Sequence, residues 1–73
     1  MTRKVRIKVD KLLNKYGLTQ KDLSELADIR QAAISQLSRG FVTRLSIEHI
    51  EKIANAFDID DINEIITLVT DEE

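Results

Sequence analysis

Apolar residues alternate with basic residues near the start of the chain. Val5, Ile7 and Val9 stand two positions apart, and a lysine or arginine occupies each position between them. A period of two is typical of a β-strand or an extended arm, because successive side chains of an extended backbone point to opposite sides. The pattern therefore predicts a strand or arm over residues 3–9.

From Asp10 onward the apolar spacing changes to three and four residues, which predicts helices. A first helix ends at Gly17, where glycine suits a left-handed C-terminal cap. Thr19 is typical of a helix N-cap, and Asp22 stands three residues later as the acid of a capping box. This second helix ends near Asp28. The residues expected on the buried faces of these two helices are Val9, Leu12, Leu13, Tyr16, Leu23, Leu26 and Ala27.

Three further helical segments are predicted. The third helix covers residues 31–38, and the fourth covers residues 46–57 with Ser46 as its N-cap. A fifth segment runs from about residue 60 to residue 66, and the β-branched residues 66–70 that follow could instead be extended. The side chains expected to face inward are Ile34, Leu37, Ile47, Ile50, Ile53, Ala54, Phe57, Ile62, Ile65 and Ile66.

Together these elements predict an all-α fold of five helices in a single domain over residues 1–73. Two interpretations of residues 3–9 stay open. The segment could be an arm that contacts a polyanion, or an edge strand that pairs with residues 66–70 within one chain or between two chains. The regular alternation favours the strand, because an arm does not need regularly buried positions.

The most specific pattern lies between residues 18 and 40. Two short helices are separated by about three residues, 28–30. Ala27 is small enough to let the second helix cross the first closely, and Ile29 is an apolar residue in the turn that can fill the space between them. This is the spacing of a helix-turn-helix over about residues 19–38.

In these positions the chain resembles the lambda-type repressor and Cro helix-turn-helix family, also called the xenobiotic response element (XRE) family. The resemblance covers roughly residues 10–66, because residues 45–57 are similar to the family's fourth helix. It implies a five-helix lambda-repressor-like DNA-binding domain whose third helix enters the major groove. The residues that carry the resemblance are Leu18, Thr19, Gln20, Leu23, Leu26, Ala27, Ile29, Ile34, Ser35, Leu37 and Gly40.

The resemblance also implies which residues meet DNA. The residues expected to face base edges are Gln31, Ala32, Ser35 and Gln36. Glutamine can bond bidentately to adenine, and alanine can contact the methyl group of thymine. Gln20 matches a position at which family members hold a backbone phosphate, and the helix N-terminus adds free N–H groups there. The further candidates for phosphate contacts are Lys21, Arg30, Arg39, Thr43 and Arg44.

Arg30 departs from the family pattern. It stands where family members often have a serine or threonine as the N-cap, and arginine has no acceptor for that purpose. A phosphate or guanine contact explains it better. Ala32 and Ala33 offer little side-chain reach. Specificity is therefore expected to depend on Gln31, Gln36, the loop over residues 41–44 and DNA shape.

The distribution of charge is more informative than the net charge of −2. Residues 1–44 contain ten Lys/Arg and four Asp/Glu, a balance of +6. Residues 45–73 contain one Lys and nine Asp/Glu, a balance of −8. Such asymmetry favours one basic face that could meet a polyanion, and the alternative is a solvated surface whose charges are interspersed by chance.

Several classes of protein do not fit the composition. The chain has no cysteine and a single histidine, His49, so neither a disulfide nor a structural zinc site is expected, and no cofactor is implied. His49 is expected on the surface of the fourth helix. No signal peptide or membrane-spanning run is evident, which favours a soluble cytoplasmic protein. The sequence shows neither a paired acid and base nor a glycine loop that could cradle a phosphate, so an enzyme is not expected.

The sequence therefore predicts a transcriptional regulator that binds double-stranded DNA, most simply a repressor that occludes a promoter. A single small module makes few contacts, so a homodimer on a palindromic operator is expected. The alternative is a protein-interaction module, or an antitoxin, that docks a protein partner through its acidic C-terminal half. The acidic residues after position 45 motivate that alternative, because a DNA-binding face has no use for them.

Overall fold

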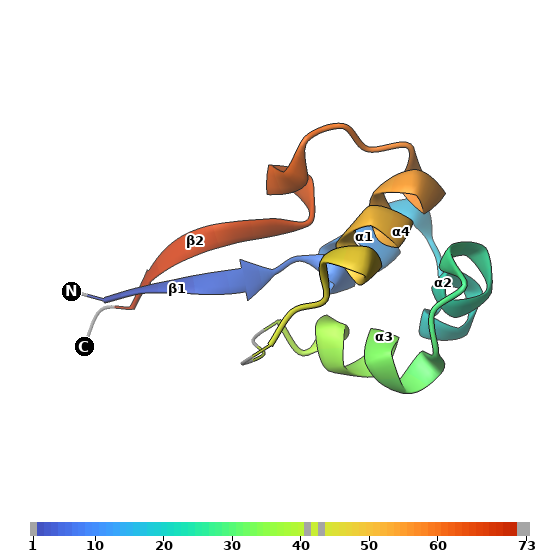
Figure 1. Ribbon diagram of the computed structural model, residues 1–73, viewed down its shortest axis with the longest axis horizontal. Coiled ribbons are helices and arrows are strands. Elements are labelled where there is room, and N and C mark those ends of the chain that lie inside the picture. The colour runs from blue at the N-terminus through green and yellow to red at the C-terminus, as the bar shows by residue number, and fades with distance from the viewer. Residues whose placement is uncertain (1, 41, 43, 72–73) are drawn as a thin grey trace.

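The computed structural model describes residues 2–40, 42 and 44–71, with the backbone alone for residue 71. Two strands project together from a body of short helices (Figure 1), and the molecule measures 38 × 24 × 23 Å along its principal axes. The elements, in chain order, are β1 (Thr2–Ile7), α1 (Val9–Tyr16), α2 (Gln20–Ala27), α3 (Gln31–Ser38), α4 (Ile47–Phe57), the 3-10 helix η1 (Ile62–Glu64) and β2 (Ile66–Asp71).

The two strands form an antiparallel ribbon within one chain. Their register runs from Thr2 opposite Asp71 to Ile7 opposite Ile66. This confirms the predicted strand and its pairing with the C-terminal segment. The strand ends earlier than expected, because Val9 already belongs to α1, where it is fully buried. The expectation of regular burial along the strand is wrong for the outer part of the ribbon, which extends beyond the helical body.

The predicted helix ends are confirmed at three places. Gly17 adopts a left-handed backbone with φ of 65° at the end of α1. The Thr19 hydroxyl accepts the backbone N–H of Asp22, and the Asp22 carboxylate accepts the backbone N–H of Thr19, both at 3.0 Å. At α4 the Ser46 hydroxyl accepts the backbone N–H of His49 at 3.3 Å. Short-range side-chain signals thus fix where these helices begin and end.

The prediction of a fifth helix is wrong, although the fold is mostly helical and has the short strand pair that was left open at its two ends. Within the described residues there are four α-helices, and residues 60–66 contain only the single turn η1 before β2 begins. The Asp61 side chain accepts the backbone N–H of Asn63 at 2.9 Å, which holds a tight turn in place. The β-branched residues that follow then extend and complete a ladder with β1.

The hydrophobic core lies where the four helices meet the base of the ribbon. Its fully buried side chains come from every part of the chain, and they are Ile7, Val9, Leu23, Ile34, Ile53 and Ile65. Four residues predicted to face inward are instead exposed, and they are Tyr16, Leu26, Ile47 and Ile62. Leu26 flanks the stripe through which α2 is buried, and Ile47 is the first residue of α4. The Tyr16 ring stacks on that of Phe57, with 4.8 Å between centroids.

Backbone hydrogen bonds join the ribbon to the helical body at one point. The N–H of Ile7 donates to the carbonyl of Gly40 at 2.7 Å, and the N–H of Lys8 donates to the carbonyl of Ile65 at 2.6 Å. Gly40 has φ of 94°, a conformation that side-chain-bearing residues rarely adopt. The end of β1 is therefore tied both to the segment after α3 and to the start of β2. We call this point the ribbon junction.

Among the described residues, no helix has the length and apolar character needed to cross a membrane.

Candidate nucleic-acid interface

The turn between α2 and α3 is built from local interactions. Asp28 ends α2 with a left-handed backbone, φ of 57°, which lets the chain reverse. The N–H of Ile29 then donates to the carbonyl of Ser24 at 3.1 Å, and the Ser24 hydroxyl donates to the carbonyl of Ile29. Ile29 and Ala27 are both buried, as predicted. The two helices are thereby held at a fixed angle by a short connection.

Lys52 of α4 braces this turn. Its Nζ donates to the backbone carbonyl of Asp28 at 3.1 Å and lies 3.6 Å from a carboxylate oxygen of Glu48. Sequence reasoning did not single out this contact, because the two residues are 24 positions apart and a lysine on an exposed helix face gives no local signal. The only basic residue of the acidic half thus supports the helix-turn-helix.

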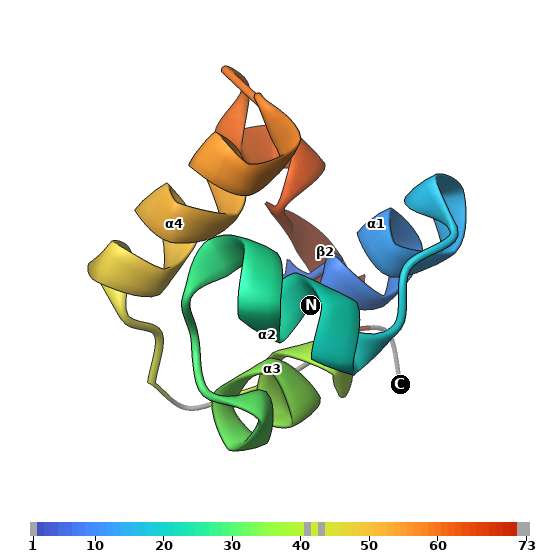
Figure 2. The same ribbon diagram turned by 90° about the vertical axis from the view of Figure 1, so that its right-hand side faces the viewer.

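Helix α3 presents a polar outer side. Ile34 and Leu37 are buried against the rest of the fold and orient the helix. Gln31, Ala32 and Gln36 are exposed, whereas Ser35 is half-buried. In Figure 1 α3 runs along the lower edge of the helical body, with α1, α2 and α4 above it, and Figure 2 shows the same arrangement from the side. Three of the four predicted base-reading residues are therefore open to solvent.

The N-terminus of α3 carries positive charge. Arg30 is its N-cap residue, is exposed, and makes no capping hydrogen bond through its side chain to any described residue. Residues 31–34 include no acid. The free N–H groups of a helix N-terminus favour an anion, and the guanidinium adds a full charge. The observed geometry agrees with the expectation that this arginine does not serve as a cap.

The N-terminus of α2 has a different character. Gln20 and Lys21 are its first two residues, and both are exposed. The capping box uses the N–H groups of Thr19 and Asp22 and leaves those of Gln20 and Lys21 outside it. The hydrogen bond from the Thr19 backbone, aided by the Thr19 side chain and the charge of Lys21, lowers the pKa of Asp22. The Asp22 carboxylate is therefore ionised at neutral pH.

A hollow of about 210 Å³ lies between α3 and the start of α4. Gln36 and Arg44 both line it, so the structure brings together a predicted base-reading residue and a predicted phosphate-binding residue. His49 also lines this hollow and is half-buried. It was expected on the surface of the fourth helix, and its place beside Gln36 and Arg44 was not predicted. Arg39 is exposed at the end of α3. Thr43 lies outside the described residues.

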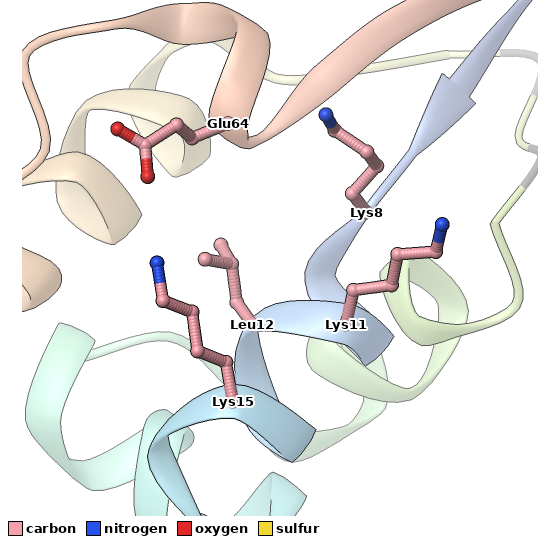
Figure 3. Close-up of a pocket in the computed structure, with 5 residues that line it drawn as sticks. All are labelled: Lys8, Lys11, Leu12, Lys15 and Glu64. Atoms are coloured by element: carbon pink, nitrogen blue, oxygen red, sulfur yellow. The ribbon is translucent and has the colours of Figure 1, made fainter.

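A second group of cations lies elsewhere. Lys8, Lys11 and Lys15 surround a hollow of about 180 Å³ together with Leu12 and Glu64 (Figure 3). In Figures 1 and 2 the segment between α4 and β2, which contains η1, lies on the opposite side of the helical body from α3. The basic half of the sequence thus does not form one uniform basic face, because three of its ten cations line a hollow that they share with Glu64 of the acidic half.

The described residues contain no cluster of three or more His, Asp or Glu side chains that could hold a metal ion.

Comparison with known proteins gives one match. Residues 8–71 match the family model of the Cro/C1-type HTH DNA-binding domain, which extends over nearly all of the chain, β2 included. No curated protein and no solved structure matches the chain. The matched span contains the capping box, the turn at Asp28 and the exposed side of α3 described above. The chain therefore belongs to the Cro/C1-type helix-turn-helix family of DNA-binding domains.

Proposed function

We propose that this protein is a sequence-specific regulator of transcription that inserts α3 into the major groove of double-stranded DNA. The observation that carries the proposal is the outer side of α3, on which two exposed glutamines stand between exposed arginines at positions 30 and 39. An α-helix fits the major groove, where each base pair displays a distinct set of donors and acceptors. A helix with these side chains can combine base reading with attraction to phosphates.

The base-reading residues form one stripe. At 100° per residue, Gln31, Ala32, Ser35 and Gln36 span about 140° of the helix surface. Gln31 and Gln36 are long enough to donate to and accept from an adenine edge, and Ala32 can meet a thymine methyl group. Ser35 lies within the stripe but is half-buried, so we assign it a contact of shorter reach. Because each copy has only two long base-reading side chains, Gln31 and Gln36, the remaining specificity is assigned to recognition of DNA shape.

Phosphate contacts surround this stripe. Gln20 and Lys21 stand at the N-terminus of α2, and their backbone N–H groups lie outside the capping box. The other proposed phosphate-binding residues are Arg30, Arg39, Thr43 and Arg44. Contacts of this kind orient the protein on DNA without reading sequence, and they make binding sensitive to salt.

We further propose that the protein represses transcription by occluding a promoter, and that it binds a palindromic site as a homodimer. The small number of base-reading side chains supports the dimer, because a two-fold arrangement doubles the contacts on a symmetric site. The family match lends no support to the alternative of a module that only docks a protein partner.

The test is binding to the DNA upstream of the protein's own gene, measured by fluorescence anisotropy over a salt series. Gln31→Ala and Gln36→Ala are each expected to weaken specific binding by roughly 10- to 100-fold, the cost of one lost bidentate base contact. A salt-dependent residual affinity is expected to remain. Asn55→Ala, which removes an exposed amide from α4, is the matched control and is expected to bind like the wild type.

Wild-type protein that shows neither preference for any DNA sequence nor salt-dependent binding would overturn the proposal. Selection from a random duplex library covers the case in which the site lies elsewhere in the genome. Repression is tested separately with a reporter gene placed behind the selected site, where expression must fall when the protein is present.

A further inference from the structure

One face of the ribbon exposes large apolar side chains to solvent. Val5 and Leu68 are directly opposite each other in the β1–β2 register, and they are 47% and 63% exposed. Ile62, at the base of the ribbon, is 52% exposed. These three residues share a hollow of about 150 Å³ whose other lining residues are Asn63, Ile66 and Thr67. We call this surface the ribbon face.

A two-stranded ribbon is at best marginally stable when both faces are in water. The inner end of this one is anchored by Ile7, which is buried, but Val5 and Leu68 lie further out along the strands. Exposed apolar side chains that cluster around a hollow are typical of a binding surface. The ribbon face therefore has the features of a surface that is covered when the protein functions.

The charges around the ribbon face indicate what covers it. Arg3 lies two residues from Val5 in the same strand, so it shares that face, near the tip of the ribbon. At the base, Asp61 precedes Ile62 and is exposed, as is Asp60. Among the described residues, the face thus carries the positive charge of Arg3 near its tip, and the turn beside its base carries the negative charges of Asp60 and Asp61. A surface of this kind is complementary to itself when a second copy is turned by a two-fold axis.

We propose that a second copy of this chain docks on the ribbon face. The two-fold axis passes near Val5 and Leu68, so that the two ribbons lie face to face and run in opposite directions. Leu68 of each protomer sits in the hollow of the other, and Arg3 of one protomer meets the partner's Asp61. The inference names the interface of the proposed DNA-binding homodimer, and its biological role rests on that proposed function.

The ribbon junction links the dimer interface to the recognition helix α3. The N–H of Ile7 is bonded to the carbonyl of Gly40, two residues after the end of α3. A dimer that fixes two ribbons against each other therefore also fixes the distance between its two α3 helices. That distance must match the separation of two half-sites, about one turn of DNA or a multiple of it.

The first test is sedimentation equilibrium of the full chain without DNA. Leu68→Asp is expected to raise the dimer dissociation constant by at least about 100-fold, because each dimer loses two buried leucines and gains two carboxylates in their place. The control is Ile47→Asp, which makes the same change at a residue that is 75% exposed on α4. It is expected to leave the dimer intact. Circular dichroism must show that both variants remain folded.

A charge exchange gives the second test. Arg3→Glu alone is expected to weaken the dimer by roughly 10-fold at low salt, since an exposed pair becomes a repulsion in two places. Arg3→Glu combined with Asp61→Arg is expected to restore most of that loss, because the pair is re-formed with its charges reversed. Lys21→Glu, on α2 and outside the ribbon face, is the control and is expected to have no effect on the dimer.

A wild-type chain that is monomeric at all accessible concentrations would overturn the inference, and so would a dimer that persists in Leu68→Asp. Failure of the exchange to restore the dimer would overturn the two-fold arrangement. Because these measurements contain no DNA, they are separate from the proposed function. A monomer that still binds a specific DNA sequence removes the interface and leaves the DNA-binding proposal standing.

Discussion

The helix-turn-helix and the ribbon differ in how their surfaces relate to the core. In the turn and α3, the apolar residues Ile29, Ile34 and Leu37 are buried and the side of α3 open to solvent is mainly polar, although Leu26 of α2 is 60% exposed. In the ribbon, Val5 and Leu68 are apolar and about half or more exposed. The recognition helix α3 thus has its large apolar side chains buried within one chain, whereas the ribbon leaves apolar area without cover from the described residues.

This difference separates two ways of presenting a binding surface. A polar surface on a packed scaffold is held in place before its ligand arrives, which favours the precise placement that base reading needs. An apolar surface on a thin ribbon gains stability only when it is covered. We therefore expect substitutions of buried residues in the helix-turn-helix to change stability directly, and substitutions at the ribbon face to change association.

The largest expected effect is in the core of the recognition helix. Ile34 is fully buried, so Ile34→Ala is expected to lower the free energy of unfolding by about 2–5 kcal/mol, through lost apolar burial and the cavity left behind. Val5→Ala removes a similar side chain from the ribbon, where it is half exposed, and is expected to cost under about 1 kcal/mol. Urea unfolding followed by circular dichroism measures both.

These measurements belong at a concentration below the dimer dissociation constant, because association would add to the apparent stability. Equal losses for the two variants would contradict the contrast between the regions, since the ribbon would then be part of the same packed unit as α3.

An intermediate effect is expected at the ribbon junction. Gly40→Ala forces alanine to adopt φ of 94°, at an expected cost of about 1–2 kcal/mol. The added Cβ would lie 3.8 Å from the carbonyl oxygen of Ile7, an ordinary contact, so the cost arises from the backbone. If the junction relaxes, the link from β1 to α3 weakens, and DNA binding should fall by more than the loss of stability explains.

Gly17→Ala is the control for this variant. Gly17 also has a positive φ, 65°, and its added Cβ would meet no heavy atom within 4 Å. It lies at the end of α1, away from the junction. Its variant is expected to lose about 1 kcal/mol of stability and to bind DNA with wild-type affinity once folded. Parallel losses of DNA binding in both variants would show that the junction has no special role.

The same contrast explains what the sequence could and could not predict. The bounds of α3 were predicted as residues 31–38, and the structure has Gln31–Ser38. The start of α2 was predicted because Thr19 and Asp22 act within a single turn. The roles of the DNA-facing residues stay predictions, but three of the four on α3 are exposed as such roles require.

The ribbon and its base were predicted less well because their structure depends on partners far away in the chain. The exposure of Val5 follows from how far the ribbon projects from the helical body, which no local pattern encodes. The predicted fifth helix failed because the apolar spacing of residues 60–66 fits a helix, whereas pairing with β1, about 60 residues earlier, favours a turn and a strand.

The smallest expected effect concerns the capping box at the start of α2. Thr19→Ala removes the acceptor for the Asp22 N–H and is expected to lower the free energy of unfolding by about 1 kcal/mol. The partner carboxylate adds a dependence on pH. The Thr19 backbone N–H lowers the pKa of Asp22 in the folded state, so the stabilisation is present above the pKa of the unfolded chain.

That stabilisation must be lost as the pH falls through the lowered pKa. Urea midpoints of wild type and Asp22→Asn, measured from about pH 7 to about pH 2, are expected to differ at neutral pH, and the difference is expected to shrink as the pH falls below about 4. Taking the difference removes the titration of the other carboxyl groups, which both proteins share. A difference that stays constant down to the lowest pH would mean that the Asp22 charge contributes nothing to the cap. The start of α2 would then depend on the Thr19 hydroxyl and on tertiary packing, as the ribbon depends on its own contacts.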